Sequence, residues 1–531
     1  MTAFDSWPWQ CWAGRTADTV ALCLDQQPVS WRQLAIAIDR QAEALRQAGL
    51  AEGCGLALRG HNGPQLLIGY LAGLQCGARV IPLNPRLPSS LLSRLLPLLG
   101  CDFGWSEPAD AWPAAITPVD LLPTEALFMS AGLAPSSAGS TAPASPPALL
   151  PVPINPAGLH RASLPNTTAP AGLRRASLLN TTAPAGLHRA SLPNATAPAE
   201  AASPAVWNPA RIASLTLTSG SSGLPKAAAH TPAAHLANAV GINKLLDFTD
   251  QHRWLLSLPL YHVSGQGIVW RWLAAGACLR ISARPLSAAL SGCTHASLVP
   301  TQLWRLLNEN ADSLKALQDV LLGGATIPPA LTADAQGRGI RCWCGYGLTE
   351  FASTVCAQLA NDQGGVGLPL PGRYLKLVAG EIWLRGAGMA AGYWQPDGVS
   401  PLTGDDGWFH TRDRGRLENG QLRIIGRLDN LFFCGSEAVQ PEDIERLLAA
   451  HPAVRQCVIV PVDDDEFGQR PVAVVDSDAP VEHLAAWLTP QLAAWQRPVN
   501  WLPMPAGLGN GGIKIARGQV RDWVRQTLRL R

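Results

Sequence analysis

The sequence lacks several features that would assign it to a class of protein directly. Its 41 Lys and Arg against 39 Asp and Glu leave a formal net charge of only +2, and both signs are mixed along the chain. Nucleic acids and anionic membranes require clustered positive charge, so neither is expected as a partner. No apolar run reaches the ~18 residues that a membrane span requires, so no stable membrane insertion is expected.

A leader peptide and a metal-binding cysteine pattern are also missing. Residues 1–5 have no basic start and a Trp-Pro-Trp sequence follows at 7–9, so we expect no secretory leader and a cytoplasmic protein. The 12 cysteines stand singly except for Cys342 and Cys344, which we expect on opposite faces of a strand. We therefore expect reduced thiols and no zinc site.

Regions of different composition indicate several domains, since 531 residues exceed what one hydrophobic core usually serves. Residues 1–129 alternate helical and strand-like patterns, with a helix predicted over 31–50, a strand over 55–58 and a helix over 65–77. Such alternation is typical of an α/β sheet. The same character returns over 210–428, which carries most of the candidate chemistry.

The last region, 429–531, is predicted to be a small α+β domain. It contains a helix over 441–450, an apolar strand over 456–462 and a terminal helix from Ala516 onward. Its boundary with the preceding region falls at 426–429, between a strand and an exposed loop.

Residues 130–209 differ in kind from the rest of the chain. They are rich in Ala, Pro, Ser and Thr, and three copies of a 14-residue repeat run over 157–170, 171–184 and 185–198. So short a repeat, with proline in each unit, buries too little apolar area to offset its chain entropy, whereas stacked solenoids normally have periods of ~20 residues or more. We predict a disordered surface insertion without a catalytic role; docking of a partner is the alternative.

A loop of glycines and hydroxyls ends a short β-rich run within 215–226. Glycines let backbone N–H groups approach an anion, hydroxyls donate hydrogen bonds, and the ammonium of Lys226 offsets phosphate charge. The order differs from a Walker A loop, because Pro225 precedes Lys226 and Ala227 follows it. We favour a nucleotide-phosphate site over a flexible Ser/Gly linker. Its residues are Thr218, Ser219, Gly220, Ser221, Ser222, Gly223 and Lys226.

This loop resembles the phosphate loop of the adenylate-forming superfamily, which includes acyl-CoA synthetases, adenylation domains of peptide synthetases and luciferases. Segments 256–267, 344–353 and 510–515 resemble in detail the o-succinylbenzoate–CoA ligases of menaquinone biosynthesis, and the likeness covers most of the chain outside the insertion. It implies an α/β fold with a large N-terminal domain of stacked α/β subdomains, a β-barrel-like part and a small mobile α+β domain. ATP, Mg²⁺ and coenzyme A are the implied cofactor and co-substrates.

The resemblance assigns roles around the phosphates and the base of the nucleotide. Glu350 would hold Mg²⁺ against the ATP phosphates and Thr349 would add a hydroxyl hydrogen bond, while Tyr346 would offer a flat face to adenine. A plain turn is the alternative for this segment. The other wall of the pocket would be formed by Gly323, Gly324 and Ala325.

The resemblance also assigns roles to three charged residues farther along the chain. Asp413 would bind the ribose hydroxyls and Arg427 a ribose or phosphate oxygen, unless both are surface charges paired with neighbours. More distant relatives usually have Gly in place of Arg412. Lys514 resembles the mobile lysine of the superfamily, which stabilises the negative charge that builds between a carboxylate and the α-phosphate.

Rotation of the small domain about Asp429 would exchange Lys514 for another loop before CoA reacts. That loop contains Gly435, Ser436 and Glu437, and its backbone would flank the pantetheine arm. Relatives often have Gly at the position of Ser436, so this role departs from the family pattern.

The resemblance places an acyl pocket around a second set of residues, which are His262, Ser264, Arg271, Thr301 and Ser353. His262 would line the pocket and gate the second half-reaction, or else be an uncharged core histidine. Arg271 would pair bidentately with the non-reacting carboxylate of o-succinylbenzoate, or else be a salt-bridged surface residue on a helix over 268–275.

Two other functions stay open from the sequence. One is a CoA ligase for another aryl or short-chain acid, and the other is a non-catalytic nucleotide-binding relative. The presence of both Glu350 and Lys514 argues against the second, because degenerate members should lose these residues first. A homodimer is left open.

Deletion of residues 130–205 tests the interpretation of the insertion. Ligase activity and melting temperature should stay nearly unchanged, because a segment without packed side chains contributes little to the folded state. Thermal unfolding and initial rates measure both effects. A large loss of stability would mean that the insertion is packed.

Overall fold

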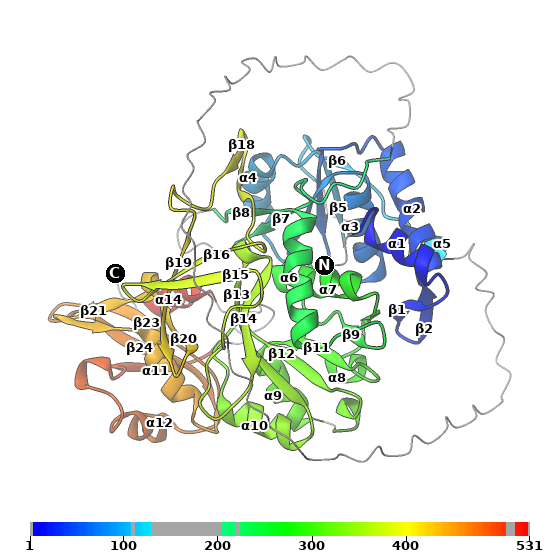
Figure 1. Cartoon of the computed structure of the whole chain (residues 1–531). Helices are drawn as coiled ribbons and strands as arrows, with labels where there is room; N and C mark the ends of the chain where they lie inside the picture. Colours follow the sequence, from blue (N-terminus) through cyan, green and yellow to red (C-terminus); the bar gives the residue numbers. More distant parts are fainter. Residues whose placement is uncertain are drawn as a thin grey trace, which may run out of the picture. The chain divides into compact units, whose positions relative to one another are not determined.

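The protein is described from a computed structural model of the whole chain, shown in Figure 1. The structure describes residues 4–107, 112–128, 204–218, 224–309, 311–505 and 516–528. The three repeats, positions 219–223 and Lys514 lie outside these ranges.

Two eight-stranded sheets form the larger part of the fold (Figure 1). The first has the order β14-β13-β12-β11-β9-β10-β1-β2, with parallel pairing from β13 to β1 and antiparallel pairing at both edges. Because parallel strands share one direction, the segments that follow β11, β12 and β13 emerge at the same edge. The strands are β1 Val20–Leu24, β2 Gln27–Ser30, β9 Arg253–Leu255, β10 Cys278–Ile281, β11 His295–Leu298, β12 Asp319–Leu322, β13 Arg341–Leu348 and β14 Ser353–Leu359.

The second sheet has the order β18-β17-β8-β7-β4-β3-β5-β6. β7 pairs parallel with β4 and antiparallel with β8, where Leu217 lies opposite Ala227. The predicted phosphate loop therefore connects two antiparallel strands, whereas a Walker A loop opens a helix. The strands are β3 Gly55–Arg59, β4 Arg79–Leu83, β5 Phe103–Ser106, β6 Thr117–Pro118, β7 Ser214–Leu217, β8 Ala227–His230, β17 Gly392–Gln395 and β18 Gly398–Ser400.

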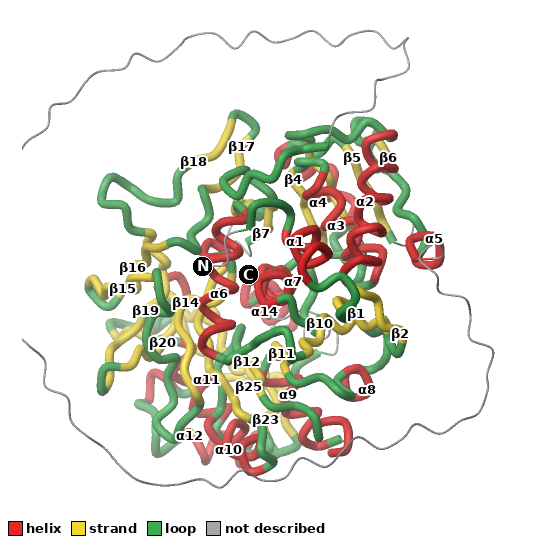
Figure 2. Tube along the Cα trace, turned by 45° about the vertical axis from the view of Figure 1, so that its right-hand side comes forward, coloured by secondary structure: helices red, strands yellow, loops and turns green. Residues whose placement is uncertain are grey.

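Both sheets pack against a common core of helices. α3 Pro64–Gln75 and α7 Val263–Ala275 are buried along most of their lengths, as expected for helices that are apolar on nearly every side. The core cluster joins Leu56 of β3 to Trp254 of β9, and Figure 2 shows α7 between β7 and β11. The other helices of this part are α1 Pro8–Arg15, α2 Trp31–Gln47, α4 Ser89–Leu99, α5 Thr124–Phe128, α6 Pro232–Leu245, α8 Leu286–Ala289, α9 Pro300–Asn308 and α10 Pro329–Gly337.

A four-stranded antiparallel sheet, β15-β16-β19-β20, follows the large sheets in sequence. Asp413 and Arg427 lie directly opposite each other on its last two strands. Its small core includes Tyr346 of β13, which ties this sheet to the first large sheet. The strands are β15 Arg373–Val378, β16 Glu381–Gly386, β19 Phe409–Glu418 and β20 Gln421–Arg427.

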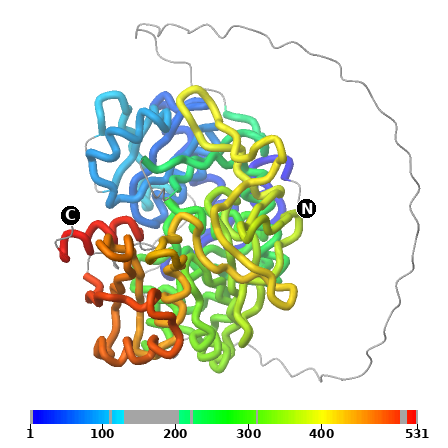
Figure 3. The backbone as a smooth tube through the Cα atoms, turned by 90° about the vertical axis from the view of Figure 1, so that its left-hand side faces the viewer, coloured from blue at the N-terminus to red at the C-terminus, as the bar shows by residue number. Residues whose placement is uncertain are grey.

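The chain after the 3-10 turn Leu428–Asn430 forms a small α+β part, coloured orange to red in Figure 3. Its strands alternate between two cores, so that Ile459 packs under α11 and α12 and Val460 under α14. The elements are β21 Phe432–Cys434, β22 Glu437–Val439, α11 Pro441–Ala449, β23 Val454–Asp464, β24 Gly468–Ser477, α12 Val481–Leu488, β25 Asn500–Pro503 and α14 Arg517–Thr527.

Most predicted elements are present with boundaries shifted by a few residues. The helix predicted over 31–50 is α2, which begins at a capping box between Ser30 and Gln33. The expectation for Cys342 and Cys344 was wrong, because side chains two residues apart on a strand share one face. Both are buried in the same cluster, and the twelve cysteines are free.

The folded part resumes before the end of the predicted insertion. Ala205 is buried, and the indole N–H of Trp207 donates to the carbonyl of Phe4 at 2.9 Å. Both contacts belong to residues within the predicted range 130–209. Across the described ranges, no helix combines the length and apolar character that a membrane crossing needs.

Candidate functional site

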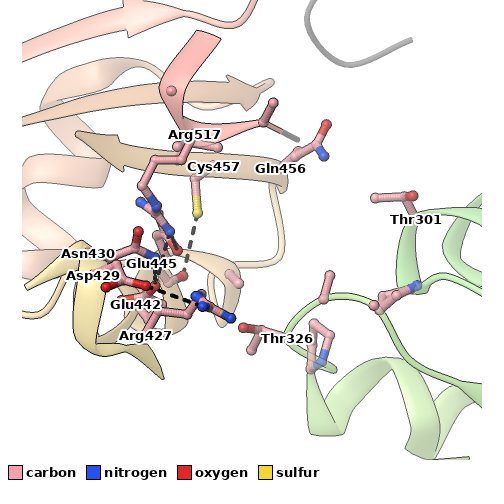
Figure 4. Close-up of a pocket in the computed structure, with 18 of the residues that line it drawn as sticks. Thr301, Thr326, Arg427, Asp429, Asn430, Glu442, Glu445, Gln456, Cys457 and Arg517 are labelled. Atoms are coloured by element: carbon pink, nitrogen blue, oxygen red, sulfur yellow. Dashed lines mark hydrogen bonds and ion pairs between the residues drawn. The ribbon is translucent and has the colours of Figure 1, made fainter. Parts of the chain in front are cut away.

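A cavity of ≈ 1780 Å³ lies at the edge where β11, β12 and β13 end. Its lining brings together predicted residues that are far apart in sequence, because the ends of parallel strands meet at this edge. Figure 4 shows the wall of the cavity near the small α+β part. The predicted residues in its lining are Thr218, Lys226, Thr301, Gly324, Ala325, Thr349, Glu350, Arg427 and Asp429. Arg412 and the start of α14 also line it.

One carboxylate and one ammonium face this cavity beside a tyrosine. Glu350 lies in the 3-10 turn Thr349–Phe351 after β13, and its Oε1 accepts a hydrogen bond from the Tyr393 hydroxyl at 2.7 Å. The Nζ of Lys226 lies 4.8 Å from the ring centroid of Tyr393, a cation–π distance. Burial and the charge of Glu350 raise the pKa of Tyr393, so its hydroxyl stays protonated and orients the carboxylate.

A second polar group joins β13 to the four-stranded sheet. The Tyr346 hydroxyl donates to Oδ2 of Asp413 at 2.6 Å, and Nη1 of Arg427 donates to Oδ1 at 3.0 Å. Burial and the charge of Asp413 raise the pKa of Tyr346, so the phenol remains a donor. Nη2 of Arg427 also contacts Asp429 at 3.3 Å. The carboxylate of Asp413 is thus held in one orientation, while Arg427 faces the cavity.

Arg271 is almost fully buried, with 1% of its surface exposed. Its guanidinium donates to hydroxyls of Ser353 at 3.2 Å and of Ser297 and Thr354 at 3.4 Å each. No carboxylate of the described residues forms an ion pair with it. Burial and the charge of Arg373 lower the pKa of Arg271 to about 9, which still leaves it charged at neutral pH. A surface salt bridge is therefore the wrong interpretation.

Three non-glycine residues beside these groups have positive φ. Ala352 has φ +52°, Ser353 has φ +117° and Arg412 has φ +62°, a region that costs residues with a Cβ roughly 1 kcal/mol or more. Ser353 holds Arg271, and Arg412 donates from Nη2 to Asp429 at 2.7 Å. The backbone at Arg412 thus has the conformation that favours glycine, the residue expected in relatives.

Other predicted residues lie outside the described lining of the cavity. His262 is the N-cap residue of α7, its ring centroid 4.7 Å from that of Tyr261. Tyr346 is buried, with its hydroxyl directed at Asp413. The remaining residues in this group are Gly323, Ser264, Arg271, Ser353, Asp413, Gly435, Ser436 and Glu437.

Several residues that contact the predicted site residues were not among those predicted from the sequence. Tyr393 contacts both Glu350 and Lys226, but it lies on β17, in a different sheet from Glu350, and nothing in the sequence connects the two. Ser297 and Thr354 bind Arg271. A hydroxyl directly after Ser353 was the one available signal for Thr354.

The composition of the cavity suits two anions that must approach each other. Lys226, Arg412 and Arg427 supply positive charge, and Thr218 and Thr349 supply hydroxyls. Among the described residues no group of three or more His, Cys, Asp or Glu could hold a metal ion. A single glutamate suits Mg²⁺, which keeps several waters and is otherwise bound by phosphate oxygens.

Comparison with known protein families gives matches over both parts of the chain. Residues 9–394 match the family described as AMP-binding enzyme, and residues 443–504 match its C-terminal domain.

Individual relatives match over nearly the full length. The 2-succinylbenzoate–CoA ligase of Escherichia coli K12 is 46% identical over 525 residues, covering 98% of this chain and 99% of the relative. That of Salmonella typhimurium LT2 is 47% identical over 525 residues, covering 98% of each. A solved structure of an E. coli MenE variant with bound OSB-AMS has a TM-score of 0.81 at 44% identity, covering 99% of this chain and 100% of that one.

A more distant solved structure shares the fold. It is the Bacillus subtilis O-succinylbenzoate coenzyme A synthetase in complex with ATP and magnesium ion, with a TM-score of 0.72 at 21% identity. It covers 94% of this chain and 96% of that one.

The Tyr346–Asp413 hydrogen bond can be tested by stability measurements. Tyr346→Phe should lower the free energy of unfolding by about 1.5–3 kcal/mol, because it removes a buried hydrogen bond to a charged group. Urea denaturation measures the change. Tyr374→Phe is the matched control, since Tyr374 is exposed and its loss should stay within about 0.5 kcal/mol. Equal effects of the two substitutions would contradict the assignment.

Proposed function

The chain belongs to the AMP-binding enzyme family, and from that premise we propose that it is the acid–thiol ligase that converts o-succinylbenzoate to o-succinylbenzoyl-CoA in menaquinone biosynthesis. Relatives 46% and 47% identical over nearly the whole chain carry this activity in their names. ATP, Mg²⁺ and coenzyme A are the cofactor and co-substrates that the reaction requires.

The reaction has two steps, the first at the α-phosphorus of ATP and the second at the carbonyl carbon of the acid. A carboxylate oxygen attacks the α-phosphorus of ATP, the bond from that phosphorus to the β-phosphate bridging oxygen breaks, and pyrophosphate leaves. The sulfur of CoA then attacks the carbonyl of the acyl-adenylate, the thiol proton is lost, and AMP leaves. The first step brings two anions together, so its barrier depends on positive charge fixed at the site.

We assign the nucleotide site to the cavity at the edge of the first sheet. Lys226 and the hydroxyl of Thr218 would bind phosphate oxygens, and Asp413 the ribose, with Arg427 beside it. Glu350, oriented by Tyr393, would hold Mg²⁺, which when bound offsets phosphate charge, and Thr349 would add a hydroxyl hydrogen bond. The hydroxyls and glycines at 219–223 complete the assignment from the sequence.

The buried guanidinium of Arg271 is the observation that carries the choice of substrate. Its described partners are three hydroxyls and the ring of Trp254, whose centroid lies 5.4 Å from Cζ. A buried cation without a carboxylate partner is costly in the free enzyme, and a bidentate carboxylate would satisfy it. Ser353 binds Arg271 and follows Glu350 by three residues. The backbone therefore limits the distance between the Cα atoms of Glu350 and Ser353 to about 10 Å. A dicarboxylate such as o-succinylbenzoate could place one carboxylate at Arg271 and the other near Glu350.

The lining of the cavity supports an arrangement for the first half-reaction. Arg517 at the start of α14 faces the cavity, whereas the turn at Gly435 does not contribute to its described lining. Lys514 precedes the first residue of α14 by three positions and would act in this cavity during the first half-reaction. We propose that rotation of residues 429–531 about Asp429 replaces the start of α14 at the cavity with the β21–β22 turn. Ser436 and Glu437 would then lie beside the pantetheine arm.

The remaining assignments concern the acyl pocket, the cellular location and the oligomeric state. His262 and Ser264 would belong to the acyl pocket through α7, which also carries Arg271, and Thr301 would reach it from the cavity. Twelve free cysteines, most of them buried, are typical of a reducing compartment and support a cytoplasmic location. A homodimer stays a prediction.

The substrate assignment predicts a specific effect of Arg271→Met. The KM for o-succinylbenzoate should rise about 10- to 100-fold, the equivalent of one charge-assisted hydrogen bond of roughly 1.5–3 kcal/mol. The KM for ATP should not change. The free energy of unfolding should stay equal or rise, because a buried unpaired cation is removed.

Pyrophosphate release with a panel of acids, ATP and CoA measures these constants. Arg32→Met is the control, since its guanidinium pairs with Asp18 at 3.3 Å and lies outside the described lining of the cavity. Release with benzoate but none with o-succinylbenzoate would show that the substrate assignment is wrong and would favour a ligase for another aryl acid. Absence of release with every acid would favour a non-catalytic relative.

The two-step mechanism predicts that Lys514→Ala separates the half-reactions. Exchange of labelled pyrophosphate into ATP should nearly disappear, while CoA thioester formation from preformed acyl-adenylate should remain, because the lysine acts only while charge builds at the α-phosphate. Equal loss of both reactions would refute this role.

A further inference from the structure

Arg517 occupies a position that local helix energetics do not explain. It is the first residue of α14, whose N-cap residue Ala516 has no side-chain cap and whose first turn has no acidic residue. A cation at a helix N-terminus interacts unfavourably with the helix dipole. Contacts outside the helix must therefore hold Arg517 there.

Those contacts come from two glutamates of α11. Nη1 and Nη2 of Arg517 donate to the two oxygens of Glu445 at 2.6 and 3.0 Å, a bidentate pair, and Nη2 also reaches Glu442 at 3.4 Å. Nη1 donates in addition to the backbone carbonyl of Ile459. The three charged side chains are 13–23% exposed. Bidentate, largely buried pairs of this kind are the strong ones.

The same network reaches the residue that follows Asp429. The amide of Asn430 donates to Oε1 of Glu442, and Oε1 of Glu445 accepts the backbone N–H of Ile459 at 2.7 Å. Figure 4 shows Asn430, Glu442, Glu445 and Arg517 grouped on one wall of the cavity. The start of α14 is thus tied to the chain directly after the proposed hinge.

We propose that Arg517 is a positioning residue for the first half-reaction, anchoring the chain directly after Lys514. The inference rests on the proposed function and on the role of Lys514. Three residues span at most about 10 Å, so fixing Arg517 confines the place where Lys514 can act. Glu442 and Asn430 join Arg517 to the residue that follows Asp429. Rotation of the small part about Asp429 would therefore move Arg517 and its contacts as a unit.

Arg517→Gln tests the proposal. Pyrophosphate exchange should fall about 10²-fold, the size of effect that a displacement of ~1 Å has on a positioned group, while thioester formation from preformed acyl-adenylate should not change. Arg525→Gln is the matched control on the same helix, since Arg525 pairs with Asp463 at 2.7 Å and lies outside the described lining. It should leave both half-reactions unchanged.

A double mutant separates positioning from a purely structural role. Adding Lys514→Ala to Arg517→Gln should lower exchange no further than Lys514→Ala alone, because residues that act as a unit are not additive. Equal loss of both half-reactions, or additive losses in the double mutant, would overturn the proposal. If circular dichroism shows that Arg517→Gln does not fold, Glu445→Gln is measured in its place. It too should lower pyrophosphate exchange without changing thioester formation from preformed acyl-adenylate.

The wild-type enzyme distinguishes this failure from failure of the proposed function. If wild type catalyses no exchange with o-succinylbenzoate, the proposed function fails. If wild type does and Arg517→Gln matches it, the positioning role alone is wrong.

Discussion

Repulsion between a carboxylate and a polyphosphate is the constraint on which this structure depends. The fold meets it by bringing the ends of parallel strands to one edge, where single residues from distant segments line one cavity. Lys226 arrives on a hairpin of the second sheet and Glu350 on the turn after β13. Tyr393 on β17 contacts both. The cavity therefore exists only when both large sheets are correctly assembled.

The fold class and much of the site could be predicted from the sequence, because local order carries that information. The capped helix α2 and the buried strand β3 follow from short-range patterns, and the segments holding Thr218 and Glu350 are recognisable as motifs. Contacts between segments that are far apart in the sequence could not be predicted. No periodicity connects Tyr393 with Glu350, or Arg517 with Glu445, since tertiary packing alone makes them neighbours. The wrong prediction for Cys342 and Cys344 had a different cause. Opposite faces of the strand were expected, whereas side chains two residues apart on a strand share one face.

Several features of the site are unfavourable for folding by themselves. Arg271 is charged and buried among hydroxyls, and Ser353, which holds it, has φ +117°. Strain and unpaired charge of this kind concentrate where a protein binds something. In this interpretation the ligand supplies the missing interaction, so the bound enzyme is expected to be more stable than the free one.

The pairing of β7 has a consequence for how this chain evolves. Its register is set by β4 on one side and β8 on the other, and neither contact depends on the length of the connection that precedes it. For a flexible connection, each doubling of length costs only about 0.6 kcal/mol in closure entropy. If that connection is as disordered as its sequence predicts, repeat expansion by replication slippage at this junction would meet little selection from the fold. The same junction is a natural point at which to graft a foreign domain.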